Sequence, residues 1–188
     1  MIHPDKLFGQ LGNRMFQMAY IYAQSRKGKI NDIYVQDPIY FDEYAKEIRA
    51  WFGQGVGKRI PQIAVHVRRG DYVGNKFYVD LAETQYYYLA MAEFGDVEFL
   101  VFSDDIEWCK KQEIFNGCSF AEGNDSITDM NLMAACEGHI IANSSFSWWA
   151  AYLSPYTKKV VCPNIKESWY ADKVVRTFVP SSWIQITG

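Results

Sequence analysis

The chain has 188 residues, of which 49% are hydrophobic and 22% charged, as in an ordered globular protein. Its net charge of −3 argues against a basic surface for nucleic acid or for an acidic membrane. No apolar run approaches the roughly 20 residues that span a bilayer. We therefore expect a cytoplasmic protein with no transmembrane segment and no nucleic-acid partner.

The four cysteines lack the close spacing of a zinc site or a redox dithiol, and the chain has three histidines. They are Cys109, Cys118, Cys136 and Cys162. We therefore expect buried free thiols, no metal site and no cofactor.

The first predicted element is a helix that begins near Asn13 and stops at Gly28. One stripe of this helix carries Met15, Met18, Ala19, Tyr22 and Ala23. The segment before it, Gly9 to Asn13, is open to two interpretations. It is a bare turn capped by Asn13, or a glycine loop whose backbone approaches a phosphate or a sugar.

A second helix is predicted near 42–52, followed by a linker, because glycines and Pro61 interrupt the pattern in GQGVGKRIP. This linker divides the chain into a first lobe, residues 1–60, and a second lobe, residues 61–188.

The second lobe alternates between buried strands and helices. Strands are predicted at 62–67, 97–102, 139–143 and 159–163, and helices at 83–94, 105–112, 127–137 and 146–153. Such alternation predicts an α/β fold with a parallel sheet, in which ligands bind outside the carboxyl ends of the strands.

Polar residues follow three of these strands, so they are expected to meet at one edge of the sheet. They are Arg68-Arg69-Gly70-Asp71, Ser103-Asp104-Asp105 and Asn143-Ser144-Ser145. Arginines and a helix N-terminus suit phosphate, and a carboxylate can accept two N–H bonds from guanine. This combination predicts a site for a nucleoside diphosphate, although one of Asp104 and Asp105 is expected to cap the next helix.

Several motifs have a simpler interpretation. Arg68 and Arg69 could form solvated salt bridges, His66 could be a core histidine, and Trp148 and Trp149 are expected to pack in the core. The tripeptide Arg69-Gly70-Asp71 also matches adhesion ligands, which would require an exposed loop.

Taken together, HVRRGDY, FSDD, DMNLMAAC and IIANSSFSWWAAYL resemble the bacterial α-1,2-fucosyltransferases of glycosyltransferase family 11, and FGQLGNRMFQMA resembles that family's glycine loop and first helix. The resemblance implies a GT-B-like fold whose Rossmann-like second lobe binds the donor. Because Asn13 and His66 stand closer together here than in the family, the N-terminal, acceptor-side lobe is expected to be much reduced.

The implied activity is an inverting, metal-independent transfer of L-fucose from GDP-β-L-fucose to the 2-hydroxyl of a galactose-type acceptor. The expected partners are thus a nucleotide-sugar donor and a glycan acceptor. The alternative is a non-catalytic GDP-sugar-binding protein whose site is completed by a partner or by a second copy in a homo-oligomer.

The resemblance also implies roles for individual residues. Arg68 and Arg69 would neutralise the diphosphate, Asp71 would orient them, and Asp104 or Asp105 would read guanine. The remaining donor-binding residues would be Gly12, Asn143, Ser144, Ser145 and Phe146, with Asn13 reaching the sugar-phosphate. Asp71 and His66 are both candidates for the general base that deprotonates the acceptor.

Overall fold

The computed structural model describes residues 7–26, 38–164 and 179–187, so the predicted helix stop at Gly28 lies outside the described residues. Within them, six parallel strands form one sheet in the order β3-β2-β1-β4-β5-β6. The strands are β1 (Ile60–Val67), β2 (Phe99–Ser103), β3 (Ser119–Phe120), β4 (Cys136–Ile140), β5 (Lys159–Pro163) and β6 (Ile184–Ile186). This is the strand order of doubly wound nucleotide-binding folds, and it reverses direction between β1 and β4.

The predicted α/β class and its parallel, Rossmann-like sheet are confirmed. Strand β1 begins at Ile60, inside the predicted linker, and β4 begins at Cys136, where a helix was predicted to continue. The edge strands β3 and β6 were missed because runs of two and three residues show no period. The GT-B arrangement, with its reduced first lobe, stays a prediction.

All six predicted helices are present. They are α1 (Leu11–Arg26), α2 (Ala45–Phe52), α3 (Tyr86–Ala92), α4 (Ile106–Cys109), α5 (Ser126–Ala135) and α6 (Ser145–Leu153). Because α1 begins at Leu11, the interpretation in which Asn13 caps this helix is wrong. Among the described residues, no helix combines the length and the apolar character needed to cross a membrane.

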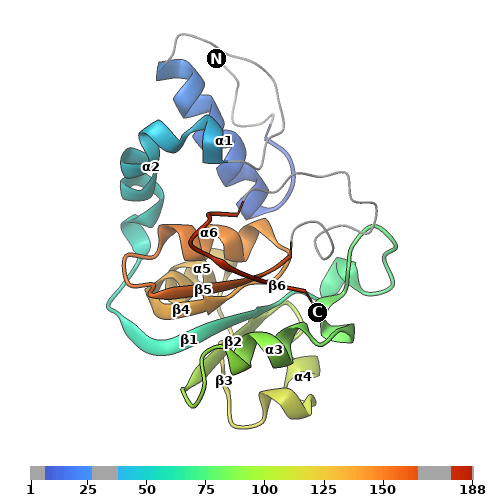
Figure 1. Ribbon diagram of the computed structural model, residues 1–188. Coiled ribbons are helices and arrows are strands. Elements are labelled where there is room, and N and C mark those ends of the chain that lie inside the picture. The colour runs from blue at the N-terminus through green and yellow to red at the C-terminus, as the bar shows by residue number, and fades with distance from the viewer. Residues whose placement is uncertain (1–6, 27–37, 165–178, 188) are drawn as a thin grey trace.

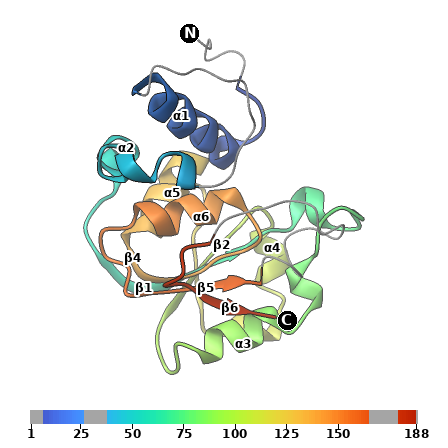
Figure 2. The same cartoon turned by 45° about the horizontal axis from the view of Figure 1, so that its top comes forward.

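The helices form layers on the two faces of the sheet (Figure 1). Helices α5 and α6 cover one face, and α3 and α4 cover the other. Helices α1 and α2 lie on the outer side of α6, as Figure 2 shows from a second direction.

The core around α6 is aromatic. Trp148 and Trp149 are fully buried, as predicted, and the ring of Phe16 lies 4.7 and 4.9 Å from theirs, centroid to centroid. Phe41 stacks on Trp149 at 5.7 Å. The helices that precede β1 therefore share one core with the sheet, and this core fixes where the N-terminus of α1 lies.

The cysteines of the described chain are free, and Cys109, Cys136 and Cys162 are buried, whereas Cys118 is partly exposed. Burial raises the pKa of the Cys136 and Cys162 thiols to about 12, so they stay protonated. The expectation of buried free thiols is confirmed for these three positions.

His139 is a fully buried histidine on β4. Its Nε2–H donates to the carbonyl of Met133 at 2.9 Å, so Nδ1 must accept from the hydroxyl of Thr157, also at 2.9 Å. Burial lowers its pKa to about 4. The folded state therefore holds this imidazole neutral.

This histidine makes stability depend on pH. Its folded pKa lies below the ordinary value of 6.5, so between pH 6.5 and about 4 the unfolded chain takes up a proton that the folded chain does not. Its contribution is complete above pH 6.5 and declines below it, by up to about 1.4 kcal/mol per pH unit. Urea unfolding across this range should show a shallower decline for His139→Gln than for the wild type. Equal slopes would show that His139 is not the titrating group.

Candidate functional site

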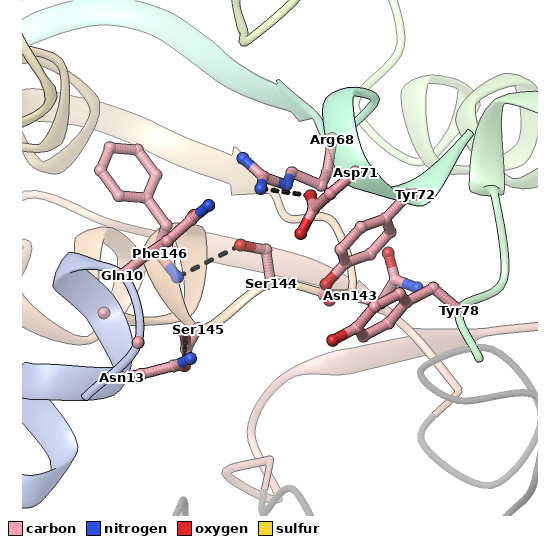
Figure 3. Close-up of a pocket in the computed structure, with 12 residues that line it drawn as sticks. Gln10, Asn13, Arg68, Asp71, Tyr72, Tyr78, Asn143, Ser144, Ser145 and Phe146 are labelled. Atoms are coloured by element: carbon pink, nitrogen blue, oxygen red, sulfur yellow. Dashed lines mark hydrogen bonds and ion pairs between the residues drawn. The ribbon is translucent and has the colours of Figure 1, made fainter. Parts of the chain in front are cut away.

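Two adjoining cavities lie at the carboxyl ends of β1 and β4, where the strand order reverses. The smaller, of about 230 Å³, is called the tyrosine chamber (Figure 3). It is lined by Gly9, Gln10, Gly12, Asn13, Arg68, Asp71, Tyr72, Tyr78, Asn143, Ser144, Ser145 and Phe146. The larger, of about 400 Å³, is called the acidic chamber. It is lined by Gln10, Leu11, His66, Arg68, Phe102, Ser103, Asp104, Asn124, Ser126, Asp129 and Phe146.

Arg68 stands at the boundary of the two chambers and lines both. Its Nη1 lies 2.8 Å from Oδ2 of Asp104, and its Nη2 lies 2.5 Å from Oδ1 of Asp71. The side chain is 15% exposed, so the guanidinium is held in place but remains reachable from the cavities. A planar guanidinium in this position can bind phosphate oxygens.

Arg69 points to the other face of the sheet. Successive side chains of a strand alternate between faces, and this alternation continues past the end of β1. The Nη1 of Arg69 lies 2.7 Å from Oδ2 of Asp80, and its guanidinium lies 3.9 Å from the ring of Trp108. Arg69 thus lines neither chamber, and the structure does not bring the two predicted arginines together.

The same geometry removes the adhesion alternative. Arg69 is 7% exposed and paired to Asp80, so Arg69-Gly70-Asp71 does not form an exposed adhesive loop. The interpretation as a solvated strand-end salt bridge is wrong for Arg69, whose pair with Asp80 is largely buried, whereas the pair of Arg68 with the half-exposed Asp71 is partly solvated.

Asp104 and Asp105 serve two different purposes. Asp104 accepts the backbone N–H of Arg69 at 2.8 Å through Oδ1, and Oδ2 pairs with Arg68. Asp105 caps α4 by accepting the N–H of Trp108 at 3.1 Å, which confirms that one of the two carboxylates is a helix cap. Asp104 lines the acidic chamber, whereas Asp105 does not.

Gly70 allows Asp104 to approach the end of β1. Its φ is +21°, and a Cβ at this position would collide with Oδ2 of Asp104. A side chain here would displace the carboxylate that holds Arg68.

Asp129 lines the site although the sequence analysis assigned it no role. It lies in the first turn of α5 and lines the acidic chamber, where Oδ1 accepts from Nδ2 of Asn124 at 3.0 Å. Burial raises its pKa. Asp129 opens the motif DMNLMAAC that carries part of the family resemblance, but an acidic residue in the first turn of a helix is common on its own account, so it was not singled out as a ligand group.

The glycine loop docks on the N-terminus of α6. Oγ of Ser145 donates to Oδ1 of Asn13 at 2.5 Å, and Ser144 caps α6 by accepting the N–H of Phe146. A Cβ on Gly12 would lie 2.6 Å from the backbone nitrogen of Phe146, so this approach requires glycine. Gly12, Asn13, Ser144, Ser145 and Phe146 therefore meet as expected, and they place a helix N-terminus beside Arg68.

His66 is 5% exposed and contributes to the acidic chamber. Its Nδ1 lies 2.9 Å from Oγ of Ser147, and its ring lies 5.4 Å from that of Phe146. Burial, and secondarily the charge of Arg68, lower its pKa to about 3. The imidazole is therefore neutral at physiological pH and is a weak base.

Asn143, expected to touch the donor, also holds a loop. Its carbonyl accepts from the hydroxyl of Tyr72 at 2.8 Å, and its Nδ2 donates to the carbonyl of Val79 at 2.8 Å. These bonds bring Tyr72 and Tyr78 to the chamber wall. Tyr72 stood inside the HVRRGDY motif, but Tyr78 lies in an irregular segment whose fold the sequence does not indicate.

The groups that line this site suit an anionic ligand. In residues 7–26, 38–164 and 179–187, no group of three or more His, Cys, Asp or Glu side chains could hold a metal ion. One arginine, a helix N-terminus and cavities on either side suit a phosphate-bearing ligand that extends both ways. Fold and site define an α/β protein of the Rossmann-like class.

Comparison with known proteins assigns the family. The model of Glycosyl transferase family 11 matches residues 15–187, so the chain belongs to that family, and the resemblance in its motifs is confirmed. It is 37% identical over 180 residues to the Alpha-1,2-colitosyltransferase of Escherichia coli, covering 88% of this chain and 59% of that protein.

Two further relatives are named as glycosyltransferases. The O-antigen biosynthesis glycosyltransferase WbnK of Escherichia coli is 34% identical over 135 residues, which are 65% of this chain and 44% of that protein. The Galactoside 2-alpha-L-fucosyltransferase Sec1 of Mus musculus is 29% identical over 108 residues, 49% of this chain and 28% of that protein. The chain thus spans less than two thirds of the length of each of these relatives.

Substitution of Arg68 and substitution of Arg69 should lower the free energy of unfolding by different amounts. Arg69→Met leaves the largely buried carboxylate of Asp80 without its cationic partner, so we expect a loss of about 3 kcal/mol in the free energy of unfolding. Arg68→Met removes partly solvated pairs, and we expect a loss of about 1 kcal/mol or less. Urea unfolding of both variants measures this difference. The reverse ranking would mean that Arg68, not Arg69, is the structural arginine.

Proposed function

We propose that this protein is a glycosyltransferase that transfers L-fucose, or a closely related sugar, from its GDP-linked donor to the 2-hydroxyl of a galactose-type acceptor. The observation that carries the proposal is Arg68, a fixed cation between two cavities at the switch point of the sheet. Family membership supplies the class of reaction. The donor, the inversion of configuration and the acceptor are parts of the proposal.

The donor would lie across both chambers. Its diphosphate would contact Arg68 and the N-terminus of α6, where the positive end of the helix dipole suits phosphate oxygens. Guanine would occupy the larger, acidic chamber, because carboxylates accept its paired N–H groups. The sugar would occupy the tyrosine chamber, so its anomeric carbon would lie close to Arg68.

Charge stabilisation would drive the bond cleavage. As the bond between the sugar and the β-phosphate breaks, negative charge grows on the phosphate oxygens. Arg68 is already oriented by Asp71 and Asp104, so no reorganisation is needed when that charge appears. Such preorganisation supports a reaction in which the protein, rather than a metal, balances the leaving diphosphate.

The positions of His66 and Asp71 in the two chambers favour one of these candidate bases. His66 lies on the acidic side and is a weak base because of its lowered pKa. Asp71 lines the tyrosine chamber, and its side chain is 55% exposed. We assign proton removal from the acceptor hydroxyl to Asp71, the carboxylate that lines the chamber proposed for the sugar.

Asp129 is better placed to bind guanine than Asp104 or Asp105 of the FSDD motif. Asp104 uses both oxygens on the end of β1, and Asp105 caps α4. Asp129 has one oxygen bonded to Asn124 and lines the acidic chamber. We therefore assign the guanine N–H groups to Asp129.

The transferred sugar has two candidates. The relatives with the names Alpha-1,2-colitosyltransferase and Galactoside 2-alpha-L-fucosyltransferase differ in the sugar that their names specify. The higher identity and coverage belong to the colitosyltransferase, so GDP-colitose should be assayed beside GDP-fucose.

Donor binding is tested by calorimetry with GDP. Wild-type protein should bind GDP, and Arg68→Met should weaken binding by roughly tenfold to a hundredfold, since a charge-assisted bond contributes about 1.5 to 3 kcal/mol. Arg59→Met is the matched control, because Arg59 lies just before the first residue of β1, at the end of the strand away from Arg68, and its side chain is 58% exposed. Failure of the wild type to bind GDP at millimolar concentration would falsify the proposal.

Transfer distinguishes the enzyme from a non-catalytic binding protein. A galactose-terminated oligosaccharide with GDP-fucose or GDP-colitose should yield a product with inverted anomeric configuration, which NMR detects. Arg68→Met is the negative control. GDP binding without transfer or donor hydrolysis would favour the alternative, a protein that requires a partner to complete its site.

Base recognition is tested by substituting Asp129. Asp129→Asn should weaken GDP binding by roughly tenfold and reduce the preference for GDP over IDP, which lacks the exocyclic amine. Asp125→Asn is the matched control, because Asp125 caps the same helix but lines neither chamber. If the preference for GDP survives in Asp129→Asn, another group reads the base.

A further inference from the structure

Two tyrosines form a stacked pair in the wall of the tyrosine chamber. The rings of Tyr72 and Tyr78 lie 4.1 Å apart, centroid to centroid, with an interplanar angle of 5°. Figure 3 shows them on the side of the cavity opposite the pair formed by Asn13 and Ser145. The phosphate site requires neither ring, so their presence in the cavity needs another explanation.

The pair is held rigidly although it lies outside regular strands and helices. Asn143, which is 3% exposed, binds the loop on both sides of Tyr78. Its backbone carbonyl accepts from the Tyr72 hydroxyl, and its side-chain Nδ2 donates to the carbonyl of Val79. One residue further, Asp80 pairs with Arg69 on the other face of the sheet. The orientation of the Tyr78 ring is therefore fixed before any ligand binds.

The chamber has walls of opposite character. On one side lie the amide of Asn13 and the hydroxyl of Ser145, and the carboxylate of Asp71 lies beside Arg68 near the tyrosines (Figure 3). On the other side lie the stacked rings of Tyr72 and Tyr78. A pyranose that carries a methyl group in place of the usual hydroxymethyl is amphipathic in the same way, because its hydroxyls lie on part of its rim and its C–H groups and methyl elsewhere.

The position of the pair relative to Arg68 selects the donor sugar over the acceptor. The guanidinium of Arg68 lies 5.5 Å from the centroid of the Tyr72 ring, so Tyr72 adjoins the place assigned to the diphosphate, and Tyr78, stacked on Tyr72, lines the same chamber. A sugar joined to that diphosphate reaches them directly. Fucose and colitose are both 6-deoxy sugars, so the argument holds for either.

We propose that Tyr78, held by Asn143 and backed by Tyr72, is the aromatic platform that selects a 6-deoxy sugar on the donor. This inference rests on the proposed function and deepens it. Tyr78 acts on specificity by contact with the sugar, whereas Asn143 is a positioning residue.

The experiment compares GDP, GDP-L-fucose and GDP-D-mannose by calorimetry, because mannose carries a hydroxyl at C6. Wild-type protein should bind GDP-fucose more tightly than GDP-mannose. Tyr78→Ala should weaken GDP-fucose binding by roughly tenfold, leave GDP binding within about twofold, and remove the preference over GDP-mannose. Tyr78→Phe keeps the ring and should keep the preference. Tyr88→Ala, at an exposed tyrosine of α3, is the matched control.

The outcomes separate the two proposals. If the wild type binds none of the three nucleotides, both proposals fall. If GDP binds but Tyr78→Ala keeps the preference for GDP-fucose, the platform is overturned and the GDP site stands. Equal weakening of all three ligands in Tyr78→Ala, with an unchanged unfolding midpoint, also overturns it, because Tyr78 would then serve the nucleotide rather than the sugar.

Discussion

The ion pairs of Arg68 with Asp104 and Asp71 are the interaction on which the rest of the site depends. They fix a positive charge at the carboxyl end of β1, beside the point where the strand order reverses. A partly buried cation needs such partners, since desolvation without them is costly. The neighbouring groups serve this arrangement: Gly70 leaves space for the Asp104 carboxylate, and Asp104 also binds the backbone of Arg69.

The two adjacent arginines show how one strand end serves stability and ligand recognition together. Pleating sends Arg68 toward the cavities and Arg69 toward Asp80 and Trp108 on the opposite face. Asp80 belongs to the loop that carries Tyr78, and Asn143 ties that loop to the end of β4. Arg69 thus stabilises the loop that forms one wall of the tyrosine chamber, and Arg68 lines the same chamber.

The helices before β1 contribute to the site through packing. The aromatic core around Trp148, Trp149 and Phe16 docks α1 on α6, and Gly12 allows close contact where the two helices begin. The hydrogen bond between Asn13 and Ser145 lies at this junction. Residues far apart in sequence therefore close one side of the tyrosine chamber.

The sequence alone determined the α/β class, the parallel sheet and the edge at which the polar residues meet. Hydrophobic periodicity and strand-end composition are local properties, and family motifs such as HVRRGDY and IIANSSFSWW are contiguous. It also indicated Arg68, Gly12, Asn13 and the start of α6 as members of one site. The sequence did not indicate where each strand begins, because the start of β4 at Cys136 depends on its pairing with β1.

Only the tertiary structure decided which side of the sheet each side chain serves. It separated Arg69 from Arg68, assigned the helix cap to Asp105, gave Asn143 a positioning role, and brought Asp129 and Tyr78 to the cavity walls. These outcomes depend on contacts between residues distant in the chain. A motif specifies which residue types are present, but pleating and packing specify which of them face a common space.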